Sequence, residues 1–195
     1  MPAHEAGLER PRLFGSAASA GIIDRVLSME AERPAVVERR LVEFELDAAF
    51  TLRASGDTTR LVPLRAKVDR VDLLAGGSFR VIDYKSKLVP DPRRSVQLQV
   101  YTAAIAQQLE RAGAPRQPAE AFYLSLEGDA PVRTLRPAKG QTLDDVLREA
   151  EERMVQALDD IGAGHFPARP SPPSLCAQCP FDSVCRKQFV ESDDA

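Results

Sequence analysis

The stretch RAKVDRVDLLAGGSFRVIDYK, residues 65–85, decides the fold of the chain. Apolar and polar residues alternate on both sides of Ala75-Gly76-Gly77-Ser78, and these four residues have the composition of a tight turn. The pattern predicts two antiparallel strands, residues 61–74 and 79–84, that are joined as a hairpin.

Three charged side chains of this hairpin are expected to meet. Side chains two residues apart share one face of a strand, so Asp83 and Lys85 should point the same way. The hairpin brings Asp69 beside Asp83 if strand twist or a bulge absorbs the offset between them. Asp72 is an odd number of residues from Asp69 and should face the other side. A D-x-K triplet alone is usually a surface ion pair. The hairpin and Asp69 favour a functional site here instead.

Two carboxylates that share one site repel each other and lose hydration. Mg²⁺ resolves this conflict, because this hard cation prefers oxygen ligands. Such an ion polarises a phosphodiester and stabilises the leaving oxyanion. Lys85 can then orient the attacking water or neutralise charge on the phosphate. The backbone carbonyl of Tyr84 is a further candidate ligand.

Apolar periodicity along the rest of the chain predicts an α/β fold with a central mixed sheet flanked by helices. The expected core spans residues 16–162, after a flexible lead-in (1–15) and before a Pro-rich linker with a cysteine cluster (163–195). The predicted helices cover residues 16–32, 94–112 and 142–161, and the predicted strands cover 36–54, 61–74, 79–84, 119–126 and 132–135. A turn at 55–58 joins the first two strands, and Thr142 with Asp145 forms an approximate capping box.

The helix after the hairpin places Gln97 and Tyr101 four residues apart, on one face. That face can cover the two carboxylates, where Gln97 could bind phosphate or a water. The alternative is that Tyr101 is a core residue and Gln97 lies at its rim.

Composition excludes several classes of protein. The net charge of −3 argues against a binder that holds DNA by charge alone. A local basic patch remains open, with Arg65, Lys67, Arg70, Arg93 and Arg94 as its candidates. No apolar run approaches the roughly 20 residues of a membrane span. The start of the chain does not resemble a signal peptide, so a cytoplasmic protein is expected. No Walker A motif is present, so ATP hydrolysis is not expected.

Cys176, Cys179 and Cys185 are the only cysteines, and they lie close together in the sequence. This clustering favours an Fe–S cluster or zinc over disulfides. His165 is the only nearby histidine that could complete a Cys3His zinc site. Otherwise, the fourth ligand comes from upstream in a longer parent chain.

The segments RAKVDRVDLL, VIDYKSK, QLQVY and C-x2-C-x5-C, in this order, resemble the RecB-like PD-(D/E)XK nucleases over residues 36–186. The closest resemblance is to the C-terminal nuclease domain of AddB-type helicase–nuclease subunits. It implies a restriction-endonuclease-like core that hydrolyses DNA, usually as an exonuclease, with Mg²⁺ or Mn²⁺. By resemblance, Asp69 and Asp83 are metal ligands, Lys85 is the catalytic lysine, and Gln97 with Tyr101 forms the QxxxY motif.

Three departures from the family qualify this resemblance. Ala66 stands where many members have Gly. Asp24 stands near the position of a histidine that is an extra metal ligand in many members, which leaves the ligand set open. The Fe–S members have four cysteines and this chain has three, so the cluster is expected in a longer protein of which this chain is the C-terminal part.

The expected partners are DNA, through a single-stranded end or tail, and a helicase subunit or helicase-like N-terminal region in double-strand-break repair or recombination. The alternatives are a catalytically silent DNA-binding or scaffold module, a stand-alone RecB-like nuclease of CRISPR adaptation, and a hydrolase of nucleotides or RNA.

Overall fold

The computed structural model describes residues 3–53, 59–86, 89–127, 132–166, 176–177, 179–181 and 184–185. The chain forms two compact units, Met1–Arg153 and Met154–Ala195. The sheet and the predicted catalytic residues lie in the first unit. The predicted cysteine site lies in the second.

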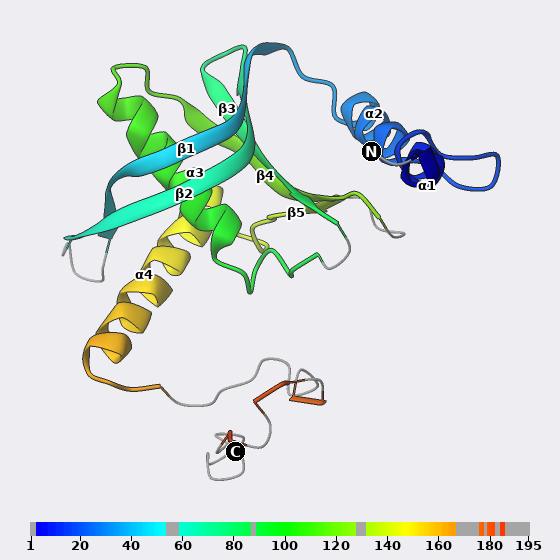
Figure 1. Ribbon diagram of the computed structural model, residues 1–195. Coiled ribbons are helices and arrows are strands. Elements are labelled where there is room, and N and C mark those ends of the chain that lie inside the picture. The colour runs from blue at the N-terminus through cyan, green and yellow to red at the C-terminus, as the bar shows by residue number, and fades with distance from the viewer. Residues whose placement is uncertain are drawn as a thin grey trace. The chain divides into compact units, whose positions relative to one another are not determined.

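A mixed sheet with the strand order β1-β2-β3-β4-β5 is the centre of the first unit (Figure 1). Neighbouring strands are antiparallel except for β3 and β4, which are parallel and are connected through α3. The strands are β1 (Val37–Arg53), β2 (Thr59–Leu74), β3 (Ser78–Lys85), β4 (Gln117–Ser125) and β5 (Val132–Thr134). The helices are α1 (Ala3–Phe14), α2 (Ile22–Glu32), α3 (Gln97–Arg111) and α4 (Leu143–Gly162). This arrangement confirms the α/β fold class that the sequence predicts.

The hairpin between β2 and β3 forms where the sequence predicts it. Gly76 and Gly77 adopt φ angles of 83° and 77°, a left-handed conformation that glycine reaches without steric cost. The pairing then runs regularly from Leu74 opposite Ser78 to Arg70 opposite Ile82. No bulge interrupts this register, so Asp69 and Asp83 follow as the next pair, without the expected offset between them. The predicted turn at 55–58 lies outside the described residues.

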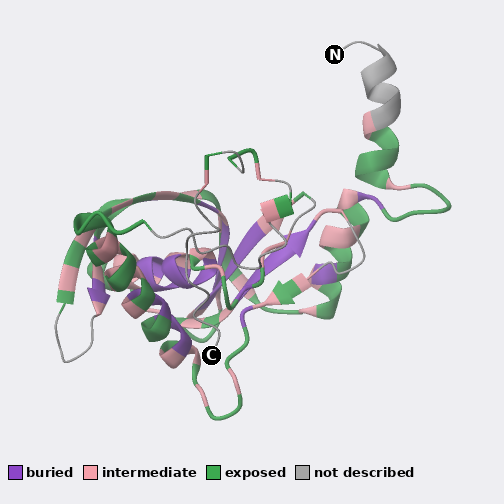
Figure 2. Ribbon diagram, turned by 90° about the horizontal axis from the view of Figure 1, so that it is seen from below, coloured by how far each residue is buried: buried purple, intermediate pink, exposed green. Residues whose placement is uncertain are grey.

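The two faces of the sheet are covered by different helices. On β3, Lys85 hydrogen-bonds to Gln97 of α3, so the odd-numbered side chains face α3. Ile82 packs instead with Met29 of α2 and with Phe122, so the even-numbered side chains face α2. Figure 2 shows buried residues along the central strands and on α3. Asp83 and Lys85 therefore belong to the α3 side of the sheet.

Side chains from α3 and α4 cover the outer edge of β1. Gln107 pairs with the backbone of Thr51, at 3.0 Å to its N–H and 2.8 Å to its carbonyl oxygen. Glu151 accepts a hydrogen bond from the Arg53 backbone N–H at 2.9 Å. These contacts satisfy backbone N–H and C=O groups of β1 that could otherwise pair with a strand of another chain. They also hold α3 against the sheet.

Within the segment expected to be a flexible lead-in, residues 3–14 form α1, a helix that the sequence patterns did not predict. Pro11 lies inside this helix, and its carbonyl oxygen accepts a hydrogen bond from Gly15 N at 2.8 Å. The next helix, α2, begins later than predicted, because the chain first makes a tight turn. A Cβ atom on Gly21 would lie 2.2 Å from Gly15 N, so a side chain does not fit there.

The start of α4 confirms the predicted capping box. Asp145 N donates to Thr142 Oγ1 at 3.1 Å, and Thr142 N donates to Asp145 Oδ2 at 2.8 Å. In the part of the chain that the structure describes, no helix is both long and apolar enough to cross a membrane.

Candidate functional site

Asp69, Asp83 and Lys85 come together at the open end of the β2–β3 hairpin. The Lys85 Nζ atom lies 2.5 Å from Asp83 Oδ2. Asp69 Oδ2 accepts a hydrogen bond of 2.7 Å from the backbone N–H of Tyr84. The regular register ends at Arg70 and Ile82, one residue before Asp69 and Asp83, so the two carboxylates lie at the same level of neighbouring strands.

The Asp83 carboxylate is buried, with 3% of the residue exposed. Burial raises its pKa, the ion pair with Lys85 opposes this, and the charge of Asp69 adds to the rise, so the net shift is upward. The Lys85 ammonium is the charge partner of Asp83 Oδ2. Two adjacent carboxylates, one of them buried, are suitable oxygen ligands for a hard cation.

The protein ligands for such a cation would be Asp69 and Asp83, with the Tyr84 carbonyl as the further candidate. Within the described ranges, no three His, Cys, Asp or Glu side chains are grouped as a metal site. Asp24 in particular is not brought to this pair. Its Oδ2 atom accepts a hydrogen bond from Gly21 N at 2.9 Å and so caps α2, which covers the opposite face of the sheet.

Gln97 and Tyr101 occupy the positions that their helical spacing predicts. Lys85 Nζ donates to Gln97 Oε1 at 3.0 Å, and Gln97 Nε2 donates to Tyr101 OH at 3.0 Å. An ammonium group can only donate, so the amide oxygen must be the atom that faces Lys85. The Tyr101 contact then uses the amide nitrogen, and the orientation of Gln97 is determined.

Tyr123 and Ser95, which no sequence pattern indicated, complete this network. Tyr123 of β4 is paired with Asp83 in the parallel register, and its hydroxyl lies 2.8 Å from Ser95 Oγ and 3.4 Å from Gln97 Oε1. Burial raises the pKa of Tyr123, a hydrogen bond with Ser95 opposes this, and the charge of Asp83 adds to the rise. The sequence around Tyr123 does not indicate this role, because Tyr123 meets Asp83 and Gln97 only when β3 and β4 pair in parallel after the α3 connection.

Glu43 of β1 is a third residue that the sequence did not select. It lies between the pairs Val42–Arg70 and Phe44–Val68, at the level of Asp69. Its φ angle is 52°, and among the described residues no other non-glycine residue has a left-handed φ. Its carboxylate is ion-paired with Lys67. Strain of this kind is often found near functional sites.

Asp72 faces the opposite side of the sheet from Asp83, as predicted, but it is fully buried. Its carboxylate accepts hydrogen bonds from Arg70 at 2.8 and 2.6 Å, from Arg80 at 2.8 Å and from Arg40 at 3.0 Å. Burial acts to raise the pKa of Asp72, but these arginines outweigh it and lower the pKa below the ordinary value. Glu30 of α2 is ion-paired with the same three arginines.

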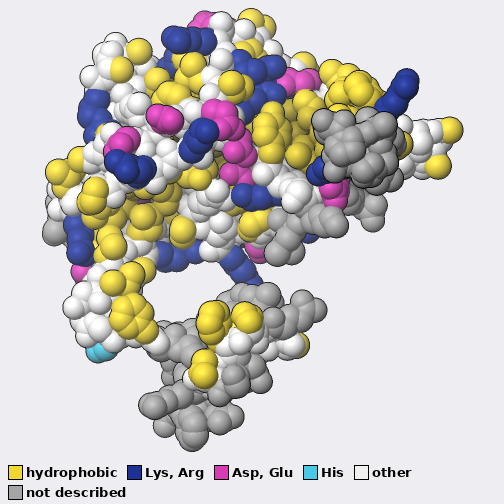
Figure 3. Space-filling view, in the orientation of Figure 1, with side chains coloured by type: hydrophobic (Ala, Val, Ile, Leu, Met, Phe, Trp, Pro, Cys, Tyr) yellow, Lys and Arg dark blue, Asp and Glu magenta, His cyan; other side chains and the backbone are white. Residues whose placement is uncertain are grey.

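The predicted basic patch is therefore wrong for Arg70, whose side chain is buried in this ion network. Arg65 and Lys67 are ion-paired with Asp47 and Glu43 on the surface. Figure 3 shows Lys and Arg side chains interspersed with Asp and Glu over the visible face, in keeping with the small net charge.

The structure does not bring the predicted cysteine site together. Cys176, Cys179 and Cys185 are free and partly exposed, and His165 is exposed. The four residues are all described, and they are not grouped as a metal site. Backbone hydrogen bonds from Cys179 N to Cys176 O and from Cys185 N to Phe181 O form local turns.

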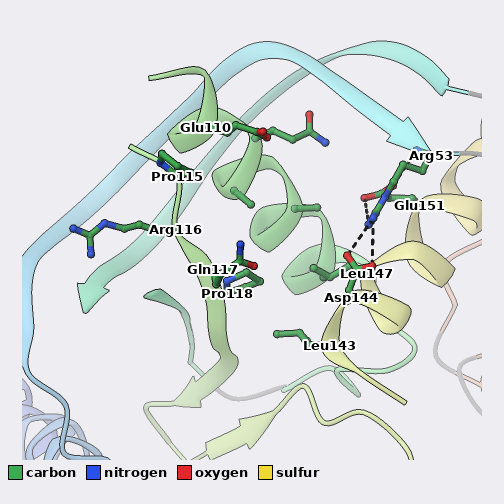
Figure 4. A pocket seen from close by; sticks show the side chains of 13 residues that line it. Arg53, Glu110, Pro115, Arg116, Gln117, Pro118, Leu143, Asp144, Leu147 and Glu151 are labelled. Atoms are coloured by element: carbon green, nitrogen blue, oxygen red, sulfur yellow. Dashed lines mark hydrogen bonds and ion pairs between the residues drawn. The ribbon is translucent and has the colours of Figure 1, made fainter. Parts of the chain in front are cut away.

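A cavity of about 430 Å³ lies away from these carboxylates, between α3, the start of β4 and the first turns of α4 (Figure 4). Arg53 lines this cavity and donates hydrogen bonds to Glu151 and Asp144, so these three charged side chains are paired with one another. The hydrogen bond with Glu151 raises the pKa of Arg53 above its usual range, and burial opposes this rise.

Comparison with known proteins identifies a family for the chain. Residues 3–186 match the PD-(D/E)XK nuclease superfamily. No curated protein matches the chain. A solved structure, "Crystal structure of SSO0001", aligns with a TM-score of 0.37 and 14% identity over 96% of this chain and 79% of that chain. On the family match, which extends over most of its length, the chain belongs to the PD-(D/E)XK nuclease superfamily.

Proposed function

We propose that this protein is a Mg²⁺-dependent DNA nuclease that hydrolyses phosphodiester bonds at the Asp69, Asp83 and Lys85 site. The observation that carries the proposal is the buried Asp83 carboxylate, which lies beside Asp69 and is ion-paired with Lys85. Mn²⁺ has the same preference for oxygen ligands and is expected to substitute.

In this proposal, the two carboxylates bind the cation and the lysine interacts with the phosphate. Asp69 and Asp83 would hold the ion, with the Tyr84 carbonyl as a further ligand. When bound, Mg²⁺ polarises the phosphodiester and stabilises the leaving oxyanion. Lys85 is better placed to reach the substrate than Asp83, because its side chain is 23% exposed and that of Asp83 is 4% exposed. Its ammonium can orient the attacking water or neutralise charge on a phosphate oxygen.

Gln97 and Tyr101 keep this ammonium in place during the reaction. Gln97 Oε1 accepts from Lys85, and Tyr101 accepts from the amide nitrogen of Gln97, so α3 fixes the height of the lysine above the strand. The same helix is anchored to β1 through Gln107. A fixed lysine does not have to reorganise as charge builds up on the phosphate.

We further propose that the protein is a RecB-like exonuclease, most similar to the AddB-type subunit. It would act on a single-stranded DNA end, together with a helicase, in double-strand-break repair or recombination. Its support is the order of the Asp69, Asp83-x-Lys85 and Gln97-x3-Tyr101 motifs, followed by three clustered cysteines. In the longer protein of this proposal, a fourth cysteine upstream would complete an Fe–S cluster.

The test is cleavage of end-labelled single-stranded DNA with Mg²⁺, with Mn²⁺ and with EDTA. Asp83→Asn and Lys85→Ala should each reduce the rate by at least about 100-fold. Asp47→Asn is the matched control, because it removes a carboxylate that pairs with Arg65 on the surface. Cleavage of linear but not circular DNA would support an exonuclease. Metal-dependent DNA binding without cleavage would favour a silent module, and variants with the parent's rate would refute the assigned site.

A further inference from the structure

Three groups surround the ammonium of Lys85, and one of them is a residue without an assigned part in the reaction. Asp83 Oδ2 lies at 2.5 Å and Gln97 Oε1 at 3.0 Å. The third group is the ring of Tyr123, whose centroid lies 5.1 Å from Lys85 Nζ. Tyr123 is fully buried and is opposite Asp83 in the pairing of β3 with β4. The ring therefore lies under the lysine, on the inner side of the site.

The hydroxyl of Tyr123 also belongs to a closed ring of hydrogen bonds. Ser95 Oγ accepts from the backbone N–H of Gln97 at 3.3 Å, and it lies 2.8 Å from Tyr123 OH. Tyr123 OH donates to Gln97 Oε1 at 3.4 Å, and the same oxygen accepts from Lys85. Since Tyr123 uses its proton toward Gln97, Ser95 must donate its own proton to Tyr123. Each hydroxyl then acts as both donor and acceptor.

We propose that Tyr123 is a positioning residue for Lys85, acting through its ring on the ammonium and through its hydroxyl on Gln97. The ring attracts the cation by its quadrupole, and the hydroxyl keeps the Gln97 oxygen turned toward the lysine. A lysine side chain is flexible, and these contacts select the conformer in which the ammonium stays beside Asp83. The inference rests on the proposed function only in that Lys85 serves the reaction.

Two substitutions separate the ring from the hydroxyl. Tyr123→Phe keeps the ring and removes the bonds to Ser95 and Gln97, so kcat for DNA cleavage should fall about three- to tenfold. Tyr123→Leu removes both contacts, and kcat should fall about 100-fold. The KM for DNA and the Mg²⁺ concentration for half-maximal rate should stay unchanged, because neither Asp69 nor Asp83 loses a ligand atom.

A matched control is available on α3. Thr102→Val also removes a buried hydroxyl, which donates to the carbonyl of Leu98 at 2.7 Å instead of to a residue of the Lys85 network. This variant should keep the kcat of the parent. A general loosening of the core would lower the activity of Thr102→Val as well, and it would raise the KM values of all three variants.

A readout without catalysis is the rate at which an amine-reactive reagent modifies Lys85, followed by peptide mass spectrometry. Lys139 serves as the internal reference. Positioning predicts slow modification of Lys85 in the parent and Thr102→Val, and selectively faster modification in both Tyr123 variants. If Tyr123→Leu fails to fold, Tyr123→Phe decides alone. Equal Lys85 labelling in Tyr123→Phe and the parent would overturn the proposal. A parent that does not cleave DNA would refute the proposed function, and labelling would still decide whether Tyr123 positions Lys85.

Discussion

Asp72→Asn should destabilise the protein strongly while sparing the chemistry of the site. The substitution keeps the size of the side chain but removes its charge. The parent carboxylate accepts four hydrogen bonds from three arginines, and the Arg70 and Arg80 side chains are only 3% and 2% exposed. Asparagine retains one acceptor oxygen and turns an N–H group toward cationic donors. Glu30 then remains as the counter-charge of the cluster.

Removing one partner of a buried ion pair costs about 3–5 kcal/mol, because the charge that remains has lost its hydration. Glu30 still neutralises part of the cluster, so we expect the lower end, about 3 kcal/mol. For a chain of this size, that value corresponds to a fall in Tm of about 6–12 °C. The activity of molecules that remain folded should be close to that of the parent, since Asp72 faces away from Asp83.

The assay is urea and thermal unfolding at neutral pH, followed by circular dichroism. Asp47→Asn is the control, because its Arg65 partner and Asp47 itself are 85% and 67% exposed, and pairs of this kind contribute little. The folded-state pKa of Asp72 is lowered, so its contribution is complete above the unfolded pKa of about 3.9 and is lost as the pH falls through the folded value. The difference between parent and Asp72→Asn should therefore shrink below about pH 4. Equal midpoints for Asp72→Asn and Asp47→Asn would refute this reasoning.

Further predictions concern the site and its surroundings. Asp83→Asn should abolish cleavage without lowering the urea midpoint measured in EDTA, because burial and the charge of Asp69 outweigh the ion pair with Lys85 and raise the pKa of Asp83; a lower midpoint would contradict this account. Asp24→Ala should lower the free energy of unfolding by about 1 kcal/mol, seen as a lower Tm, because the hydrogen bond from Gly21 N at the start of α2 is lost; it should leave the Mg²⁺ requirement for cleavage unchanged, and a raised requirement would make Asp24 a ligand after all. The isolated chain should be colourless or lose its brown colour rapidly in air, because three cysteines leave an iron site open; an air-stable four-iron cluster in anaerobically purified protein would disprove this, and one tightly held zinc would favour the Cys3His alternative.

Local sequence patterns predicted the sheet and most of its helices correctly. Alternation of apolar residues located the long β1 and β2 strands and the β2–β3 hairpin, because strand periodicity depends only on neighbouring residues. The same reasoning missed α1, whose sequence has weak periodicity and contains Pro11. It also placed the start of α2 too early, because the close approach of Gly15 and Gly21 is not visible in a pattern of apolar residues.

By itself, the sequence determined that Asp83 and Lys85 share a face, that Asp72 has the opposite one, and that Gln97 and Tyr101 form a pair on the next helix. These relations depend on the repeat of a strand or a helix, which is a local property. Only the tertiary structure decided which side chains meet across elements. The hairpin register set Asp69 beside Asp83, and packing of α2 on the other face kept Asp24 away from them. The parallel pairing of β3 with β4 brought Tyr123 under Lys85, because residues far apart in the sequence become neighbours only after the α3 crossover is complete.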